Sequence, residues 1–449
     1  MKKVKDVYSG FYTVDDAINM DVDTVKNLQE TYSNKLKVVL SGGKYFKKAE
    51  NAGFIDHEGK RHVDMMGAVG VMTVGNNNPF IWEQIEKVFK AKSYIMGAVS
   101  YHNIAAALYR NLALTTPGQK LTKAQISGGG AEAIEGVIKL CKIAQRNKPN
   151  KTKILSTINA FHGKTAGAVS VGGKDTWQMY QGRLLLDQVT HIPFNDVEAL
   201  KKELSSGIYQ GFIVEPIQGE GGVHVATDEF MQTAREYCDK YDTIFVADEI
   251  QTGCCRTGKF WAVEWPNVIP DVITFGKGIS GGLIPLAGYI AKAEVYDAAY
   301  GSAETAFHHT ATYQGNAIAA AAGIAALQFM IENDLCTAAQ EKGKIIKDSM
   351  LEAQKKYPGI IKEVRGRGCL IGVEFEPVQA GLKEKYGENW AMECEHYFSE
   401  EFRIQIMHSF NNPKVFRWLP PLTAPMEDIE YALDAFDKSV EHVYKLSKG

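Results

Sequence analysis

Short apolar runs alternate with longer amphipathic segments over most of the chain. From about Pro79 onward, several apolar runs are separated by segments of ordinary helical length, an alternation typical of a mostly parallel sheet. The pattern therefore predicts an α/β fold. The predicted strands of the main sheet are Lys123–Ile126, Lys153–Ile158, Phe212–Val214, Ile244–Ala247, Val272–Phe275 and Leu286–Ile290.

The two ends of the chain have other patterns. Residues Asp16 to about Leu36 alternate as a surface helix does, and Gly53–Asp64 is typical of a hairpin that turns at Glu58-Gly59. The last helix, Glu427–Leu446, has apolar residues on one face at helical spacing. The predicted strands of a smaller sheet are Gly368–Phe375, Ile404–Met407 and Val415–Leu419.

Composition excludes some classes of partner. The chain has 449 residues, and Lys+Arg 50 against Asp+Glu 53 leave a net charge of -3, which argues against nucleic acid or an anionic membrane held by bulk electrostatics. The most apolar segment, Ala317–Ile331, is too short for a membrane span and predicts a buried helix. We expect no secretory signal after Met1. Seven cysteines without regular spacing favour a reducing compartment, so we expect a cytoplasmic protein.

Lys277 follows a buried strand and is flanked by Gly276 and Gly278. Because a buried ammonium is costly, a lysine in such a place can have a lowered pKa and form a Schiff base. A lysine exposed at a loop tip is the alternative, and for a single lysine it is the more frequent case.

The segment Ser127–Ala133 places glycines at the start of a helix. Backbone N–H groups there form an anion site, and the spacing also matches the dinucleotide pattern G-x-G-x-x-A. That pattern requires an acid about 20 residues further on, and none is present, so NAD is disfavoured. Phosphate binding is favoured over a purely structural turn.

Aromatic and acidic residues follow other predicted strands. Phe161 and His162 could stack on a flat ligand, although packing is the more frequent role of such a pair. Glu215 begins a glycine-rich loop at a strand end, and Asp248 ends a buried strand, where it needs a cation or several donors; a capping role is the alternative. No histidines or cysteines have metal-ligand spacing, so no metal is expected.

A phosphate cradle, a stacking aromatic, a strand-end acid and a glycine-flanked lysine together favour pyridoxal 5′-phosphate as the cofactor. Asp248 would keep the pyridine nitrogen protonated, and Lys277 would carry the Schiff base. From about Gly53 to the end, the chain resembles the class III aminotransferases, which have the fold type I of pyridoxal-phosphate enzymes. The motifs that carry the resemblance are Glu215–Gly222, Asp248–Gly253, Thr274–Gly278, Thr312–Asn316, Arg365–Gly368 and Arg417–Leu422.

The resemblance implies a large cofactor-binding domain and a smaller α+β domain built from both chain ends. We assign residues 1–78 and 332–449 to the small domain and residues 79–331 to the large one. It also implies a homodimer with shared active sites, in which Thr312 reaches the phosphate of the other subunit; whether dimers pair into tetramers is open.

The resemblance also assigns roles to single residues. Lys277 is the covalent lysine and proton carrier, Gln251 bonds the phenolic oxygen, and Arg417 grips a substrate carboxylate while Glu220 pairs with it when no carboxylate is present. The expected cofactor-binding residues are Gly130, Ala131, Phe161, His162, Glu215, Asp248, Ile250, Gln251, Lys277 and Thr312, with Phe161 and Ile250 on the two faces of the ring.

Two positions depart from the family pattern. Ala131 stands where the family often has Ser or Thr, so one hydroxyl contact to the phosphate is missing. Cys255 stands where the family favours glycine, and a side chain at that turn could disturb the loop.

Within the family, the chain is most similar to putrescine and other diamine aminotransferases. The expected donor is a terminal diamine such as putrescine or cadaverine, and the expected acceptor is 2-oxoglutarate or pyruvate. Phe161–Lys164, the loop from Glu215 to Val223 and Ser409–Lys414 support this choice. An ornithine or 4-aminobutyrate aminotransferase and an amino-acid racemase or epimerase are the alternatives, and a non-catalytic binding protein is a more distant one.

Overall fold

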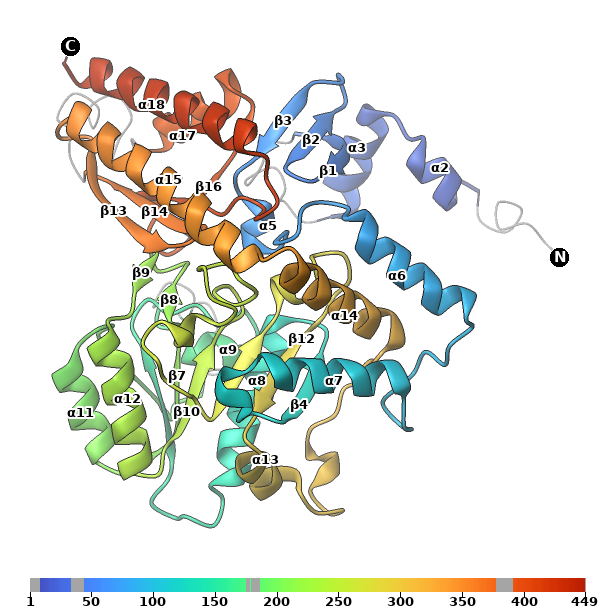
Figure 1. Ribbon diagram of the computed structural model, residues 1–449, viewed down its shortest axis with the longest axis vertical. Coiled ribbons are helices and arrows are strands. Elements are labelled where there is room, and N and C mark those ends of the chain that lie inside the picture. Colours follow the sequence, from blue (N-terminus) through green and yellow to red (C-terminus); the bar gives the residue numbers. More distant parts are fainter. Residues whose placement is uncertain (1–8, 34–43, 175–177, 179–185, 377–390, 449) are drawn as a thin grey trace. The chain divides into compact units, whose positions relative to one another are not determined.

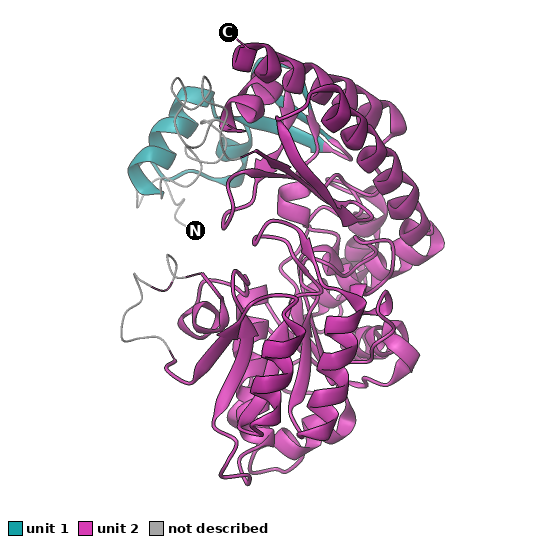
Figure 2. Ribbon diagram, turned by 90° about the vertical axis from the view of Figure 1, so that its left-hand side faces the viewer, with its two compact units in different colours: residues 1–49, 53–62 teal, residues 50–52, 63–449 magenta. Residues whose placement is uncertain are grey.

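The structure is a computed structural model that describes residues 9–33, 44–174, 178, 186–376 and 391–448. The chain divides into two compact units, residues 1–49 with 53–62 and residues 50–52 with 63–449 (Figure 2). The first unit contains α2 (Val14–Ile18), α3 (Val22–Tyr32) and β2 (Gly53–Asp56). The surface helix expected from Asp16 is thus two helices, and its predicted end at residues 34–36 lies outside the described residues.

A seven-stranded sheet forms the centre of the second unit (Figure 1). The strand order is β4-β12-β11-β10-β7-β5-β6, and all strands are parallel except β12, which runs antiparallel to both neighbours. This confirms the predicted mostly parallel sheet. The strands are β4 (Lys123–Ser127), β5 (Lys153–Thr157), β6 (Val189–Ile192), β7 (Tyr209–Val214), β10 (Ile244–Asp248), β11 (Val272–Phe275) and β12 (Ala287–Ala291).

Both faces of this sheet are buried, because neighbouring residues along each strand point to opposite sides. On β10, Phe245 and Ala247 belong to one core, whereas Val246 belongs to another core with α8. The helices of this part of the chain are α6 (Pro79–Lys90), α7 (Asn103–Thr115), α8 (Gly130–Ala144), α9 (Ala166–Val171), α11 (Val197–Ser205), α12 (Asp228–Lys240), α13 (Ala293–Tyr300) and α14 (Ala317–Glu332).

A smaller antiparallel sheet has the order β13-β14-β17-β16. Three helices complete its core: α15 packs on β13 and β14, and α18 packs against both α15 and α17. The elements are β13 (Ile361–Arg367), β14 (Leu370–Phe375), β16 (Met407–His408), β17 (Val415–Trp418), α15 (Leu335–Lys356), α17 (Ala391–Glu401) and α18 (Met426–Lys448).

Some predicted boundaries are wrong. The strand expected at Ile404–Met407 is two strands, because β15 (Ile404–Gln405) pairs with β3 (Arg61–Asp64) while β16 pairs with β17. Gly368 has a φ of 53° and lies in the turn before β14, so the strand begins later than predicted. β6 and β13 were not predicted, because both carry several polar residues.

Among the described residues, no single helix is long and apolar enough to cross a membrane. Only α14 and α15 taken together meet the criteria of length and composition, and they are bent by 65° relative to each other.

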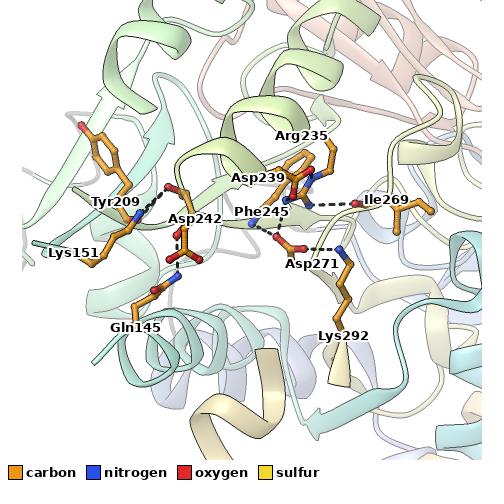
Figure 3. A network of polar contacts seen from close by, with 11 residues as sticks. Gln145, Lys151, Tyr209, Arg235, Asp239, Asp242, Phe245, Ile269, Asp271 and Lys292 are labelled. Atoms are coloured by element: carbon orange, nitrogen blue, oxygen red, sulfur yellow. Dashed lines mark hydrogen bonds and ion pairs between the residues drawn. The ribbon is translucent and has the colours of Figure 1, made fainter. Parts of the chain in front are cut away.

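Asp271 ties the amino ends of β10 and β11 together (Figure 3). Its carboxylate accepts a hydrogen bond from the Phe245 backbone N–H at 2.8 Å and pairs with Lys292 at 2.8 Å and Arg235 at 3.1 Å. Arg235 also pairs with Asp239, whose side chain is 65% exposed. Asp271 is only 11% exposed, so if its charge were removed, little water could reach Lys292 and Arg235 to solvate them in its place.

Asp271→Asn is therefore expected to lower the free energy of unfolding by about 2–3 kcal/mol, because it leaves the partly buried Lys292 without its counter-charge and Arg235 with only the exposed Asp239. Asp239→Asn, in the same network, is the matched control and should cost less than about 1 kcal/mol, because that pair faces water. Urea unfolding of both variants measures the difference. Equal losses would contradict the account.

Candidate active site

A cavity of about 220 Å³ lies at the carboxyl edge of the main sheet. The parallel strands β5, β7, β10 and β11 end at this edge, as does β4, which explains why residues far apart in the sequence meet there. The lining residues are Gly130, Ala131, Phe161, His162, Gly163, Glu215, Glu220, Asp248, Ile250, Gln251, Thr252 and Lys277. Nearly all the predicted site residues are thus brought together.

Lys277 borders the cavity directly after β11. Its φ of 46° is unusual for a residue with a side chain and places backbone strain at the site. Burial lowers the pKa of Lys277, although the negative charges of Glu220 and Asp248 act in the opposite direction. Within the described part of the chain its Nζ has no hydrogen bond or ion pair, so the amine gives up its proton more readily than an ordinary lysine does.

Asp248 ends β10 and is held by three donors. Its carboxylate accepts from the Thr274 hydroxyl at 2.8 Å and the Ile250 backbone N–H at 3.1 Å, and it lies 2.6 Å from Nδ1 of His162. Burial by itself lowers the pKa of His162, but the hydrogen bond and the charge of Asp248 outweigh burial and raise that pKa. Asp248 therefore lies against a histidine that binds its proton more tightly than usual, and its position at the cavity suits a cationic ring nitrogen.

Glu215 supports the segment that carries Phe161. One of its carboxyl oxygens accepts the Phe161 backbone N–H at 2.9 Å. Burial raises the pKa of Glu215 to about 7, while the positive charge of His162 opposes the shift. At neutral pH this carboxyl group therefore carries a proton part of the time.

The amino end of α8 presents free backbone donors to the cavity. Gly129 is the N-cap without a side-chain cap, so the N–H groups of Gly130 and Ala131 have no partner in their own helix. A Cβ added at Gly129 would meet nothing within 4 Å, so there is space beside these donors. Such a site fits a phosphate group.

Ile250 and Gln251 form another wall. The Ile250 side chain lies 3.1 Å from the position of an added Cβ on Gly130, which places it beside the amino end of α8. Gln251 donates to the Val69 carbonyl at 3.3 Å, while its Oε1 atom has no partner among the described residues. An added Cβ on Gly219 would overlap that oxygen, so glycine permits the close approach.

Arg417 on β17 forms a buried ion pair with Glu220. The two residues are 1% and 3% exposed. The Phe410 backbone N–H donates to Glu220 at 3.1 Å, and the Arg417 guanidinium lies 5.8 Å from the Phe410 ring centroid. Arg417 Nε has no partner in the described part of the chain, so the guanidinium keeps a donor for another acceptor.

Thr312 is exposed and does not line this cavity. Its predicted contact with a partner subunit stays a prediction. Thr252 and Gly163 line the cavity, and Thr274 binds Asp248, although none of the three was proposed as a site residue. Thr274 could have been found, because it precedes Lys277 by three residues on the neighbouring parallel strand. No group of three or more metal-binding side chains occurs among the described residues.

The family model described as Aminotransferase class-III matches residues 40–440. The chain belongs to the class III aminotransferases. An uncharacterised aminotransferase of Schizosaccharomyces pombe is 52% identical over 431 residues, which are 96% of this chain and 89% of that protein. As a member of this family, the chain described here uses pyridoxal 5′-phosphate as its cofactor.

Two solved structures have the same fold. The ornithine aminotransferase of Toxoplasma gondii ME49 matches with a TM-score of 0.85 at 24% identity, covering 99% of this chain and all of that one. The ornithine δ-aminotransferase of Plasmodium falciparum matches with a TM-score of 0.78 at 27% identity, covering 95% of this chain and all of that one. The fold is therefore fold type I, as predicted.

The residues around the cavity fit the cofactor. Backbone N–H groups at the amino end of α8 suit its phosphate, and Asp248 suits its pyridine nitrogen. The Lys277 amine, which has no partner among the described residues, suits the covalent bond that this family forms with the cofactor. Gln251, which lines the same cavity, has an acceptor oxygen without a partner among the described residues.

Lys277→Ala should abolish covalent attachment of the cofactor. After borohydride reduction and denaturation, the wild-type chain is expected to keep the cofactor on the peptide that contains residue 277, as mass spectrometry can detect. Lys164→Ala is the matched control, because Lys164 lies 6.0 Å from the Phe161 ring centroid and has no expected bond to the cofactor. Retention by Lys277→Ala, or loss by Lys164→Ala, would refute the assignment.

Proposed function

We propose that this aminotransferase moves an amino group from a terminal diamine, such as putrescine or cadaverine, to 2-oxoglutarate or pyruvate. The observation that carries the proposal is the buried ion pair between Glu220 and Arg417, which favours donors without a carboxylate beside the reacting amine. The choice of a diamine among such donors rests on the resemblance of Phe161–Lys164, the loop from Glu215 to Val223 and Ser409–Lys414 to diamine aminotransferases. Because Arg417 is already paired with Glu220, its guanidinium is not available to bind a carboxylate of the donor. A diamine has no carboxylate and can enter without breaking the pair.

The acceptor makes the opposite demand on the same pair. A 2-oxo acid has a carboxylate next to its reacting carbon, and an arginine binds such a group with two parallel hydrogen bonds. We propose that the acceptor replaces Glu220 as the partner of Arg417, while the Phe410 backbone N–H keeps hold of Glu220. One cavity then serves two substrates of different charge.

The proton transfers are assigned to Lys277. When bound, pyridoxal phosphate supplies an electron sink for the substrate carbon. With its lowered pKa, the Lys277 amine accepts the proton that leaves this carbon and holds it for return. We assign the pyridine nitrogen to Asp248, which His162 holds in place by a hydrogen bond, and Glu215 holds the backbone of Phe161.

The remaining residues are assigned to parts of the cofactor. We assign the two faces of the ring to Phe161 and Ile250, the phenolic oxygen to Gln251, and the phosphate to Gly130 and Ala131. Thr312 belongs to the phosphate site of a second subunit in a homodimer. The cytoplasmic location and the division into residues 1–78, 79–331 and 332–449 belong to the same proposal.

Two other activities would use the same residues. Ornithine and 4-aminobutyrate also carry an amine far from a carboxylate, so the Glu220–Arg417 pair admits them as donors. An amino-acid racemase would use Lys277 for proton transfer but would need no 2-oxo acid.

A donor-by-acceptor activity panel tests the substrate proposal. We expect kcat/KM for putrescine or cadaverine to exceed that for ornithine and 4-aminobutyrate by roughly tenfold or more. Product formation should require 2-oxoglutarate or pyruvate. A higher value for ornithine would refute the diamine proposal, and loss of chirality without any 2-oxo acid would indicate a racemase.

Arg417→Ala tests the division between donor and acceptor. We expect kcat/KM for the 2-oxo acid to fall roughly 100-fold, because two charge-assisted hydrogen bonds are lost, while the diamine half-reaction falls less than tenfold. Glu220→Gln is the companion variant, and it should instead improve donors that carry a carboxylate near the amine. Half-reactions followed by cofactor absorbance measure both. Equal losses with donor and acceptor would sink the role of Arg417.

A further inference from the structure

Two cysteines from distant parts of the sequence meet beside the active-site loop. The Sγ atoms of Cys255 and Cys336 lie 2.7 Å apart. Cys255 lies in the turn that follows Asp248 and Gln251, and Cys336 is the second residue of α15. A disulfide bond is about 2.05 Å long, so a movement of about 0.7 Å would join the two sulfurs.

The backbone at this turn is strained. Cys254 and Cys255 have φ angles of 57° and 65°, in the left-handed region that residues with side chains rarely adopt. Glycine would occupy this region without cost. The Cys255 side chain is nevertheless present there, with 1% exposure, and it points its sulfur at Cys336.

Other contacts already hold the same turn against the small sheet and α15. The Cys369 backbone N–H donates to the Arg256 carbonyl at 3.0 Å, and the Gln340 side chain donates to the Gly258 carbonyl at 2.5 Å. Arg256 donates to the Pro420 carbonyl at 2.5 Å. These bonds limit how far the two sulfurs can separate.

We propose that Cys255 and Cys336 form a reversible disulfide, a modification site that takes low-molecular-weight disulfides as its oxidant. Cys336 is half-buried and reacts first, because Cys255 lies in the core. The Cys336 thiolate attacks one sulfur of the oxidant and releases one thiolate, which takes up a proton. Cys255 then attacks the Cys336 sulfur and releases the second thiol. Two protein thiols are oxidised, and one oxidant disulfide is reduced to two thiols.

Geometry decides the second step. Contact with Cys336 and burial raise the pKa of Cys255 above the usual range of thiols, so its thiolate is scarce. The two sulfurs are nevertheless held together, and such positioning gives an intramolecular reaction a high effective concentration. The mixed disulfide is therefore replaced by the internal one.

The cross-link would join the loop that carries Gln251 to the first turn of α15. It closes a long loop of chain, which restricts the unfolded state more than the folded one. The oxidised enzyme should therefore unfold at a higher temperature than the reduced one, and reductant should reverse the change.

The test uses the full-length holoenzyme incubated with oxidised glutathione, then alkylated and digested for mass spectrometry. The wild type is expected to yield a Cys255–Cys336 cross-linked peptide, the loss of two free thiols and a raised melting temperature, all reversed by dithiothreitol. Cys255→Gly, which also relieves the positive-φ strain, should stop at a glutathione adduct on Cys336. Cys336→Ala should give neither product.

Cys394→Ala is the matched control, because Cys394 is buried in α17 and should not affect the cross-link. A wild type that keeps glutathione on Cys336, or that cross-links Cys254 instead of Cys255, would overturn the proposal. If oxidised glutathione raises the melting temperature of Cys255→Gly as much as that of the wild type, the proposal is also overturned. Cofactor absorbance and circular dichroism of each variant show that it is folded before oxidation.

Discussion

Parallel pairing of the central strands is the constraint on which the active site depends. In the register of β10 and β11, Asp248 lies opposite Thr274, and Lys277 follows three residues later. Because β5 and β7 run in the same direction, the segments that follow them bring His162 and Glu215 to the same edge. A shift of β10 by one residue would turn Asp248 toward one of the buried cores.

Charge balance is the second requirement at this edge. Three carboxyl groups, an imidazole and an amine lie around one small cavity, where burial disfavours the charged form of each of them. The hydrogen bond to Asp248 raises the pKa of His162, whereas burial lowers the pKa of Lys277 and raises that of Glu215 to about 7. The surroundings thus shift the pKa values of these three groups in different ways, which suits Lys277 to act as the base of the site.

The sequence predicts those parts that depend on local order. Apolar runs followed by Asp248, Glu215 or Lys277 identify strand ends, and these ends form the cavity. Contacts between segments are different. The overlap of Gly219 with Gln251, the bond from Thr274 to Asp248 and the meeting of Cys255 with Cys336 depend on how strands and helices pack, which no local pattern contains. β6 was not predicted because it lies at the edge of the sheet, where a strand needs fewer apolar residues and therefore has a weaker apolar pattern.

The antiparallel strand β12 has a consequence for the size of the ligand. It lies between β4 and β11, so two strand spacings, about 10 Å, separate the strand that leads to the free N–H groups of α8 from the strand that leads to Lys277. The first residue of β12, Ala287, pairs with Ser127 at the end of β4, so the start of β12 lies between these two strand ends. A ligand that contacts both the donors of α8 and Lys277 therefore spans the start of this antiparallel strand.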